Sequence, residues 1–415
     1  MERRNLKRVL IHSIVFSPDG VSTAYLYNDI ALGLVKNGFE VIVLTTTPHY
    51  NLIASELVRQ PIAKKIFGIY YVSQFNGIKV YHVPLKKYKS SFLRIVSFVY
   101  WHIISLFIGL SIKKINFVIS PSPPLSIGLV SLLIAKFKGA KSIYNVQEVY
   151  PDLLINQGIL KSSILINLLK SCEKFIYNNS AAVTTIDELF HSTISPRFVK
   201  SNKLYIIPNF VDTDLYKPLK QKIRIPSVFG EDKNKIKILY AGNIGFFQDW
   251  EPVFYAANQL KNEKIEFWIV GEGVQKSKLE KEVKNQKFSN IRIFPYQSRE
   301  YMPLINNYVD IHFIAINPKM EQEGFPSKVY TIMACAKPLI VVTGDRTPLY
   351  NFLKEKNCSE LIIDNRNINF TEAIRRLAND KKLREELGKN GYNEIIKNYS
   401  KNVVVSQYVE LLRSI

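Results

Sequence analysis

The sequence predicts an α/β protein with two doubly wound, mostly parallel sheets. Its 415 residues, 47% of them hydrophobic, are enough for two separate cores. Short apolar runs alternate with helical patterns in both halves of the chain, as expected for parallel strands joined by crossover helices. The stretch between the halves, residues 217–235, has no clear periodicity, and we expect a linker there.

The strands are predicted from apolar runs bounded by polar or turn-forming residues. In an N-terminal domain over residues 1–216 they are Arg8–Ile14, Glu40–Thr46, Lys79–Val83, Asn116–Ser120, Ser142–Val146, Ala181–Ile186 and Leu204–Pro208. In a second Rossmann-like domain over residues 236–395 they fall within residues 235–242, 265–273, 290–296, 310–316, 338–344 and 360–365. A last helix, residues 396–415, is expected to return to the N-terminal domain.

The charge of the chain points to an anionic partner. The formal net charge is +21, and residues 57–147 contain thirteen Lys or Arg and no Asp or Glu. We expect no nucleic acid, because the chain shows no basic helix, no aromatic-basic RNA motif and no zinc pattern. Cys172, Cys335 and Cys358 have neither metal-ligand spacing nor an even count, which favours reduced thiols in the cytoplasm. The first apolar run is short and ends at Pro18, so it predicts a strand rather than a signal peptide.

Residues 95–112 form the most apolar stretch of this acid-free region. They are flanked by basic residues within residues 86–114. About 20 apolar residues are needed to span a bilayer, so the length is borderline. We expect an interfacial helix on an anionic cytoplasmic leaflet, with peripheral attachment through residues 86–114. The alternative is a buried helix of the α/β domain, and one helix can serve both purposes by using two faces.

Residues 321–340, EQEGFPSKVYTIMACAKPLI, combine a loop, a helix start and a strand. Pro326 and Ser327 suit the first positions of a helix, whose exposed N–H groups with Lys328 would seat a diphosphate. Glu323 lies just outside, within reach of sugar hydroxyls. The alternative is an ordinary turn with a start similar to a capping box.

Four other loops follow predicted strands, at the sheet edge where open α/β sheets bind ligands. Gly20, the pair Gly242 and Gly245, and Gly271 each permit close backbone approach to a ligand, although a structural turn explains each of them equally well. In the fourth loop, Glu148 could orient or deprotonate an acceptor hydroxyl. We interpret the nearby Asp152 as a helix cap.

Taken together, these motifs resemble the family-4 retaining glycosyltransferases of the GT-B fold. The resemblance covers most of the chain and is strongest over residues 206–342. The segments that carry it are IIPNFVDTDLYKP, YAGNIGFFQ, IVGEG and EGFPSKVYTIMACAKPLIV, with TTTPHYN and PSPPL in the first half. They are most similar to the bacterial polysaccharide branch, which includes the fucosamine- and colanic-acid-type transferases.

The resemblance implies a role for each matching residue. Glu148, Lys328 and Glu323 would act in catalysis, with Lys328 on the phosphates and either Glu323 or Glu321 on the transferred sugar. The donor-binding set would be Gly20, Asn243, Gly245, Gln248, Gly271, Glu321, Gly324, Phe325, Pro326, Ser327 and Thr331. Thr331 replaces the second carboxylate with which many members hold the ribose. Asn243, Gln248 and Asp249 occupy a loop that often holds an Arg and a Lys, so Lys328 carries more of the phosphate charge.

The resemblance implies retaining transfer of a hexosyl or N-acetylhexosaminyl group. We expect a UDP-sugar donor rather than a GDP-sugar, and two domains facing across a cleft. The expected acceptor is a lipid-linked saccharide at the inner face of the cell membrane. We expect no cofactor or metal, because no Asp-x-Asp cluster follows a strand. The alternatives are a nucleotide-sugar epimerase of the same shape and a non-catalytic membrane-associated scaffold.

Overall fold

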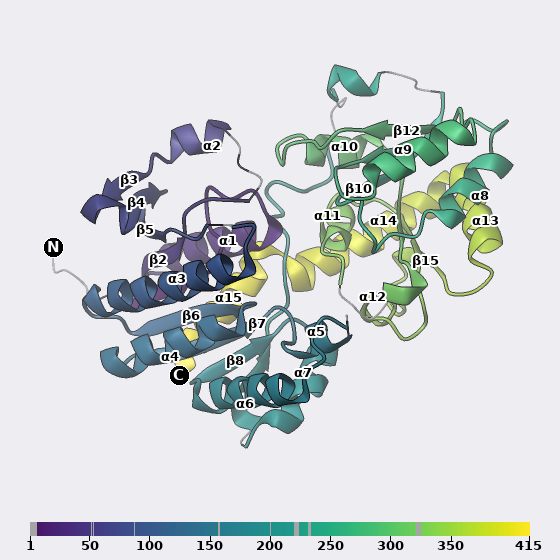
Figure 1. The fold of residues 1–415 in the computed structure, drawn as a ribbon. Helices are drawn as coiled ribbons and strands as arrows, with labels where there is room; N and C mark the ends of the chain where they lie inside the picture. The colour runs from purple at the N-terminus through teal and green to yellow at the C-terminus, as the bar shows by residue number, and fades with distance from the viewer. Residues whose placement is uncertain are drawn as a thin grey trace. The chain divides into compact units, whose positions relative to one another are not determined.

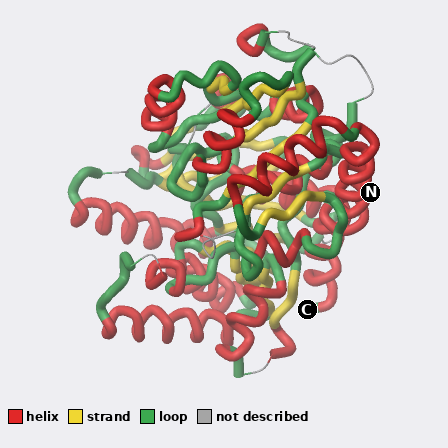
Figure 2. Tube along the Cα trace, turned by 90° about the vertical axis from the view of Figure 1, so that its right-hand side faces the viewer, coloured by secondary structure: helices red, strands yellow, loops and turns green. Residues whose placement is uncertain are grey.

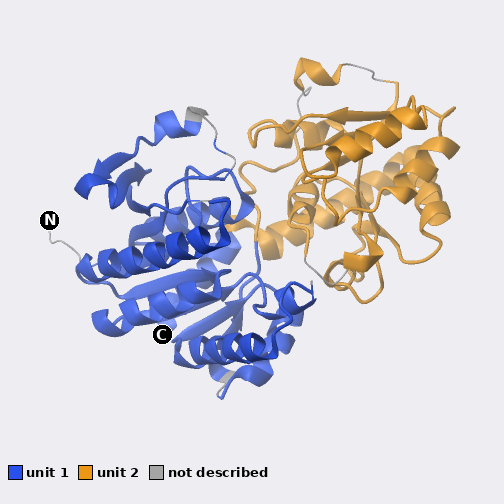
Figure 3. Cartoon of the chain, in the orientation of Figure 1, with its two compact units in different colours: residues 1–209, 402–415 blue, residues 210–401 orange. Residues whose placement is uncertain are grey.

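The computed structural model describes residues 6–50, 52, 54–86, 88–156, 158–199, 201–219, 224–230, 234–320 and 325–415. The chain divides into two compact units (Figure 3). The N-terminal unit holds residues 1–209 and 402–415, and the C-terminal unit holds residues 210–401. Each contains one sheet covered by helices, so the predicted α/β class with two doubly wound sheets is confirmed.

The sheet of the N-terminal unit has the strand order β3-β4-β5-β2-β1-β6-β7-β8-β9. Its strands are β1 (Arg8–His12), β2 (Glu40–Thr46), β3 (Ala63–Lys65), β4 (Tyr70–Phe75), β5 (Ile78–Val83), β6 (Phe117–Ser122), β7 (Lys141–Val146), β8 (Ala182–Thr185) and β9 (Leu204–Ile206). All seven predicted strands are present and pair in parallel where they are neighbours. The pair β3 and β4 was not predicted. It forms an antiparallel edge, where half-exposed strands lack the continuous apolar run that marks a buried one.

Helices cover both faces of this sheet (Figures 1 and 2). They are α1 (Ser22–Lys36), α2 (Ala54–Arg59), α3 (Ser91–Ser111), α4 (Leu125–Lys138), α5 (Asp152–Asn156), α6 (Ser163–Asn179), α7 (Glu188–Ile194) and α15 (Lys401–Ser414), with short 3₁₀ turns η1 (Ile66–Gly68), η2 (Ser195–Arg197) and η3 (Ser201–Lys203). Gly33 of α1 packs so closely on Val405 of α15 that a Cβ there would lie 2.3 Å from the valine. The last helix therefore belongs to the N-terminal unit and lies beside α1.

The C-terminal unit has a parallel sheet with the order β12-β11-β10-β13-β14-β15. Its strands are β10 (Ile236–Ala241), β11 (Ile265–Val270), β12 (Ile291–Phe294), β13 (Ile311–Ala315), β14 (Leu339–Val342) and β15 (Ser359–Ile362). Its helical segments are α8 (Glu251–Gln259), α9 (Lys276–Asn285), α10 (Met302–Tyr308), α11 (Lys328–Ala334), α12 (Pro348–Leu353), α13 (Arg366–Asn379), α14 (Lys381–Glu394), η4 (Ser227–Phe229), η5 (Pro318–Met320) and the π-helix η6 (Ile395–Tyr399). All six strands expected in this half are present.

The segment expected as a linker packs against the C-terminal unit chiefly through Phe229. Phe229, in η4, is fully buried. Its ring lies 5.0 Å from that of Trp268 and 4.3 Å from that of Phe294, measured between centroids. Ile225 packs against the same cluster, and the Asn307 side chain bonds to the backbone of Lys217 and Leu219. The sequence has no periodicity there because scattered contacts, rather than a helix or strand face, make the attachment.

Candidate functional site

Lys328 lies at the start of α11 and reaches the carboxyl end of β10. Its Nζ lies 3.8 Å from the centroid of the Tyr240 ring. A Cβ added to Gly242 would lie 2.7 Å from the same Nζ, so the glycine makes the space that the ammonium occupies. The Tyr240 hydroxyl donates to the Asn243 carbonyl at 2.6 Å, which fixes the ring. Tyr240 was not among the predicted site residues, because nothing in the sequence shows which side chain packs beneath the lysine.

The electrostatic setting of Lys328 is unusual. Burial lowers the pKa of its ammonium to about 7, and within the described part of the chain no carboxylate shifts it back. A buried cation without a counter-ion is costly, whereas an anionic ligand placed against it would restore the charged form. The position is therefore suited to binding a phosphate group.

The loop after β10 is joined to the loop after β11 by backbone hydrogen bonds. The Ile244 amide donates to the Glu272 carbonyl at 2.8 Å, and the Gln275 amide donates to the Ile244 carbonyl at 3.0 Å. Gly271 has φ 156°, and a Cβ there would lie 1.9 Å from the Gly242 carbonyl oxygen. The contact between the loops thus requires a glycine at position 271. This agrees with the structural turn that the sequence left open as an explanation of Gly271.

Asn243 and Gln248 shape this loop from within. The Gly245 amide donates to Oε1 of Gln248 at 2.9 Å. The Asn243 side chain lies against Gly245 and Gly273, since a Cβ on either glycine would come within 3 Å of its amide group. Both side chains thus contact the backbone of the loop next to Lys328. The resemblance implies that they contact the phosphates, and their described contacts are with the loop itself.

The start of α11 differs from the prediction. The helix begins at Lys328, and Ser327 is the N-cap with αR geometry and no side-chain cap bond. The amides of Val329 and Tyr330 donate to the carbonyls of Pro326 and Ser327, within the turn. The capping-box-like start, which was the alternative to a diphosphate seat, lacks its side-chain bond.

Phe325 and Thr331 make structural contacts within the C-terminal unit. The Phe325 ring lies 5.0 Å from the Phe352 ring and 5.3 Å from the Tyr330 ring, in an aromatic cluster with Tyr399. The Thr331 hydroxyl donates to the Lys328 carbonyl at 2.9 Å, within its own helix. Glu321, Glu323 and Gly324 lie outside the described residues.

In the N-terminal unit, Gly20 lies in the loop after β1. Its amide donates to the Tyr50 carbonyl at 3.0 Å. The neighbouring Asp19, which was not singled out, is buried and accepts bonds from the amides of His49 and Tyr50 at 2.8 and 2.7 Å. Burial raises the pKa of the Asp19 carboxyl. The loops after β1 and β2 are thus tied together at the carboxyl edge of the sheet.

Glu148 follows β7, as predicted, and its side chain reaches the surface. Neighbouring groups still shield the carboxyl from part of its water, and this desolvation raises its pKa. Its backbone carbonyl accepts a bond from the Ser122 hydroxyl at 2.9 Å, which anchors the loop to β6. A carboxylate with a raised pKa on an anchored loop is suited to proton transfer.

Asp152 is not the helix cap that we expected. Its carboxylate pairs with Arg197 and lies 4.0 Å from Lys170. Arg197 also binds the buried Glu173, with N–O distances of 2.7 and 2.6 Å. The ion pairs fasten the end of the Glu148 loop to the core of the unit, a role that no local sequence pattern reveals.

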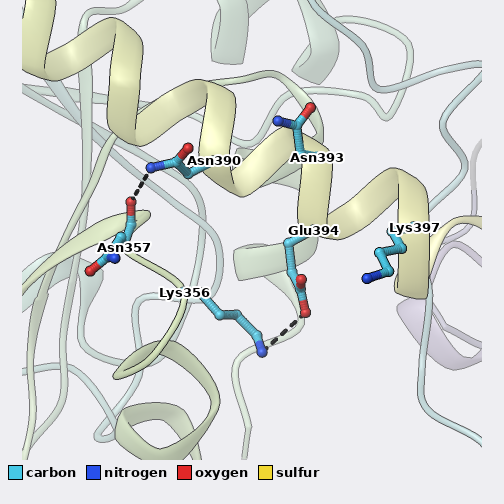
Figure 4. Close-up of a pocket in the computed structure, with 6 residues that line it drawn as sticks. All are labelled: Lys356, Asn357, Asn390, Asn393, Glu394 and Lys397. Carbon is cyan, nitrogen blue, oxygen red and sulfur yellow. Dashed lines mark hydrogen bonds and ion pairs between the residues drawn. The ribbon is translucent and has the colours of Figure 1, made fainter.

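A described pocket lies elsewhere in the C-terminal unit (Figure 4). It has a volume of about 310 Å³ and is lined by Lys356, Asn357, Asn390, Asn393, Glu394 and Lys397. Lys356 pairs with Glu394 at 3.1 Å, and the Asn390 amide donates to the Asn357 carbonyl at 2.9 Å. Four of its six lining residues are thus engaged with one another, and none of the predicted site residues lines it. Among the described residues, no group of three His, Cys, Asp or Glu side chains could hold a metal ion.

Residues 221–394 match the family model for glycosyl transferases group 1. The chain contains a group 1 glycosyltransferase domain. It falls in the C-terminal unit and includes Lys328, Tyr240 and Gly242. The predicted resemblance is confirmed by this glycosyltransferase domain.

Two curated relatives agree with this glycosyltransferase assignment, and one solved structure shares the fold. The chain is 24% identical over 357 residues to the putative colanic acid biosynthesis glycosyl transferase WcaI of Escherichia coli K12, covering 82% of this chain and 84% of WcaI. It is 26% identical over 240 residues to the probable glycosyltransferase WbjE of Pseudomonas aeruginosa, covering 55% and 58% of the two chains. Anabaena HepE, solved with UDP and glucose, matches 99% of this chain and 100% of its own with a TM-score of 0.70 at 12% identity. At 12% identity the structural similarity supports the fold alone, and that fold is GT-B as predicted.

Substituting Gly242 with Ala tests the glycosyltransferase site directly. The new Cβ would displace the Lys328 ammonium, and we expect kcat/KM for sugar transfer to fall by about 10- to 100-fold. A matched control is Gly139→Ala, which also has a positive φ but meets nothing within 4 Å. That variant should lose some stability and keep its activity. Equal activity in the two variants, measured with saturating acceptor, would contradict the placement of Lys328.

Proposed function

We propose that this glycosyltransferase moves a hexose or N-acetylhexosamine from a UDP-sugar to a lipid-linked saccharide, with retention at the anomeric carbon, in the synthesis of a bacterial surface polysaccharide. The observation that carries the proposal is the Lys328 ammonium, which lies buried against Tyr240 and Gly242 without a described carboxylate partner. The UDP bound by HepE supports the choice of base, and the name of WcaI supports the polysaccharide product.

In the proposed reaction, the donor diphosphate lies against Lys328 and the backbone of the Gly242 loop. As the bond between the sugar and the diphosphate breaks, negative charge grows on the departing phosphate oxygen, and a fixed ammonium in a dry site stabilises it. Lys328 takes the place that a divalent metal fills in other transferases, so we propose that transfer needs no metal. Either Glu323 or Glu321 would contact the transferred sugar.

The acceptor part of the proposal rests on the N-terminal unit. The acceptor hydroxyl attacks from the face that the diphosphate leaves, forming the new glycosidic bond and releasing one proton. Glu148 is the proposed helper for that proton, since its raised pKa favours taking it up. The acid-free stretch of residues 57–147 and the apolar helix α3 support a lipid-linked acceptor and a proposed location at the inner face of the cell membrane.

A panel of UDP- and GDP-sugars, each assayed with a polyprenyl-diphosphate-linked acceptor, tests the proposal. We expect turnover with a UDP-sugar, an α-linked product from an α-linked donor, and the same rate after addition of EDTA. An inverted product would overturn the retaining mechanism. Conversion of donor alone to an isomer would indicate an epimerase. No turnover, together with unchanged activity of Lys328→Ala in cells, would indicate a scaffold.

A further inference from the structure

α3 is apolar on its exposed face as well as on the face that it packs against the sheet. Its buried residues are Trp101, Ser105, Ile108 and Gly109. Its exposed side carries large hydrophobic side chains with helical spacing: Phe92, Ile95, Val96, Val99, Ile103 and Phe107. A covering helix in water buries its apolar stripe and exposes polar residues. The outer face of α3 is thus suited to an apolar medium.

Length and composition agree with this interpretation. Within the described part of the chain, α3 is the one helix long and apolar enough to cross a membrane, and 22% of the relevant stretch is buried. The core helix of a soluble protein passes the same test but would be mostly buried. Because α3 is also fixed to the sheet through Trp101 and Ile108, it would lie along a membrane surface rather than cross it.

The surface continues onto α4, which packs beside α3, and onto α6, which packs beside α4. Gly109 of α3 lies against Ile134 of α4, where a Cβ would come within 2.4 Å, and Gly128 of α4 lies against Ile176 of α6, where it would come within 2.9 Å. The three helices therefore form one close-packed layer on one face of the sheet (Figure 1). On its outer side Phe137 of α4 is 70% exposed and Ile164 of α6 is 81% exposed.

The turn between β3 and β4 adds a hydrophobic tip to this layer. Phe67, in η1, is 99% exposed and has φ 53°, a conformation that few side chains adopt. The Tyr100 hydroxyl of α3 donates to the Ile69 carbonyl at 3.2 Å, so the tip is fixed beside α3. A fully exposed phenylalanine next to an exposed apolar helix face enlarges the same patch.

The charges on this surface have one sign. α3, α4 and α6 together contain one acidic residue, Glu173, which is fully buried and bound to Arg197. Exposed basic residues lie on the helices and at their ends: Lys86, Lys89, Arg94, Lys113, Lys136 and Lys174. Lysine and arginine near an apolar surface attract anionic lipid headgroups.

We propose that the outer face of α3, α4 and α6, together with the tip at Phe67, docks on a lipid bilayer that carries anionic headgroups. We call this surface the docking face. Membrane attachment would then involve a whole helical layer rather than α3 alone. The role of this attachment in catalysis rests on the proposed function. A second copy of the chain is a poorer occupant, because a symmetric dimer would bring two basic surfaces together.

Vesicle binding of the full-length chain tests the docking face. We compare vesicles of phosphatidylcholine with and without phosphatidylglycerol, using the single variants Phe107→Ser, Phe137→Ser and Ile164→Ser. Each should weaken binding to the anionic vesicles about tenfold, because each removes one apolar side chain from the lipid interface. Binding should also fall as salt rises. The matched control is Ile368→Ser on α13, a 52% exposed residue in the C-terminal unit, and it should bind as the unaltered chain does.

Three results would overturn the docking face. Loss of binding in Phe107→Ser alone would confine attachment to α3. Equal binding to neutral and anionic vesicles would remove the role of charge. Failure to bind vesicles, with a dimer that Phe107→Ser dissociates, would make the surface an interface between copies. Vesicle binding without any binding of UDP would instead contradict the proposed function and still support the docking face.

Discussion

Lys328→Met is expected to lower kcat/KM for sugar transfer by about 10²- to 10³-fold at pH 7, the usual loss when one fixed group that stabilises transition-state charge is removed. Methionine keeps most of the volume of the lysine but carries no charge. The loss should appear mainly in kcat, because the charge on the leaving diphosphate grows as the bond breaks. Steady-state kinetics with the preferred donor provide the measurement.

The same variant should be more stable than the unaltered chain. Burial lowers the pKa of Lys328 to about 7, well below its value of about 10.4 in an unfolded chain. Between these two pH values the unfolded chain binds more protons, so the lysine makes stability rise with pH, and it destabilises the fold at neutral pH. In Lys328→Met that contribution disappears. Thermal melts of the two proteins from pH 6 to pH 10 should show the largest difference at the acidic end.

Lys337→Met is the matched control, since Lys337 is a second lysine of this unit whose pKa burial lowers. Its ammonium donates to the Val309 carbonyl at 2.8 Å and is not near the loop after β10. Removing it should cost stability, because the carbonyl loses its partner, and should leave kcat/KM unchanged. If Lys328→Met lost stability and Lys337→Met lost activity, the roles assigned here would be reversed.

Arg197→Met is expected to destabilise the N-terminal unit by about 3–5 kcal/mol, as observed when one partner of a buried ion pair is removed. Glu173 is fully buried and accepts bonds from Arg197 and, at 2.8 Å, from the Tyr177 hydroxyl. Without the guanidinium the carboxylate is left charged and unpaired in the core. Differential scanning calorimetry should show the melting transition of the N-terminal unit lowered by about 10 °C.

The pH dependence of Arg197→Met follows from the same contacts. Burial already raises the pKa of Glu173, and Arg197 opposes that rise. In the variant the pKa rises further, so the folded chain binds more protons than the unfolded chain, and stability should fall as pH increases from 5 to 8. The double variant with Glu173→Gln should recover much of the lost stability and lose the pH dependence. A loss of stability independent of pH would show that the carboxylate is not the source of the cost.

The strands were predictable because parallel strands buried on both faces require continuous apolar runs. Such runs placed β1, β2, β10 and β11 correctly in the chain. The hairpin β3–β4 was missed, since an edge strand with one face in solvent has no such signature. Phe229 was missed for a related reason: one side chain docking into a pocket leaves no periodic pattern.

The candidate site was predictable in position and only partly in detail. The sequence placed Lys328 and the Gly242 loop at the carboxyl edge of one sheet, because parallel strands end there together. It did not reveal Tyr240 beneath the ammonium, the inward turn of Asn243 and Gln248, or the pairing of Asp152 with Arg197. Each of these depends on the direction of a side chain toward a residue distant in sequence, which local patterns do not encode.

The account depends on Lys328 being the group that receives the donor diphosphate, and the uptake of protons on UDP binding tests this most directly. At pH 8 most of the Lys328 side chains are neutral in the free chain, and binding of a diphosphate should restore their charge. Titration calorimetry in two buffers of different ionisation enthalpy should therefore show uptake of nearly one proton per UDP, and no uptake in Lys328→Met. Equal affinity for UDP in both proteins, with no proton taken up by either, would contradict the account.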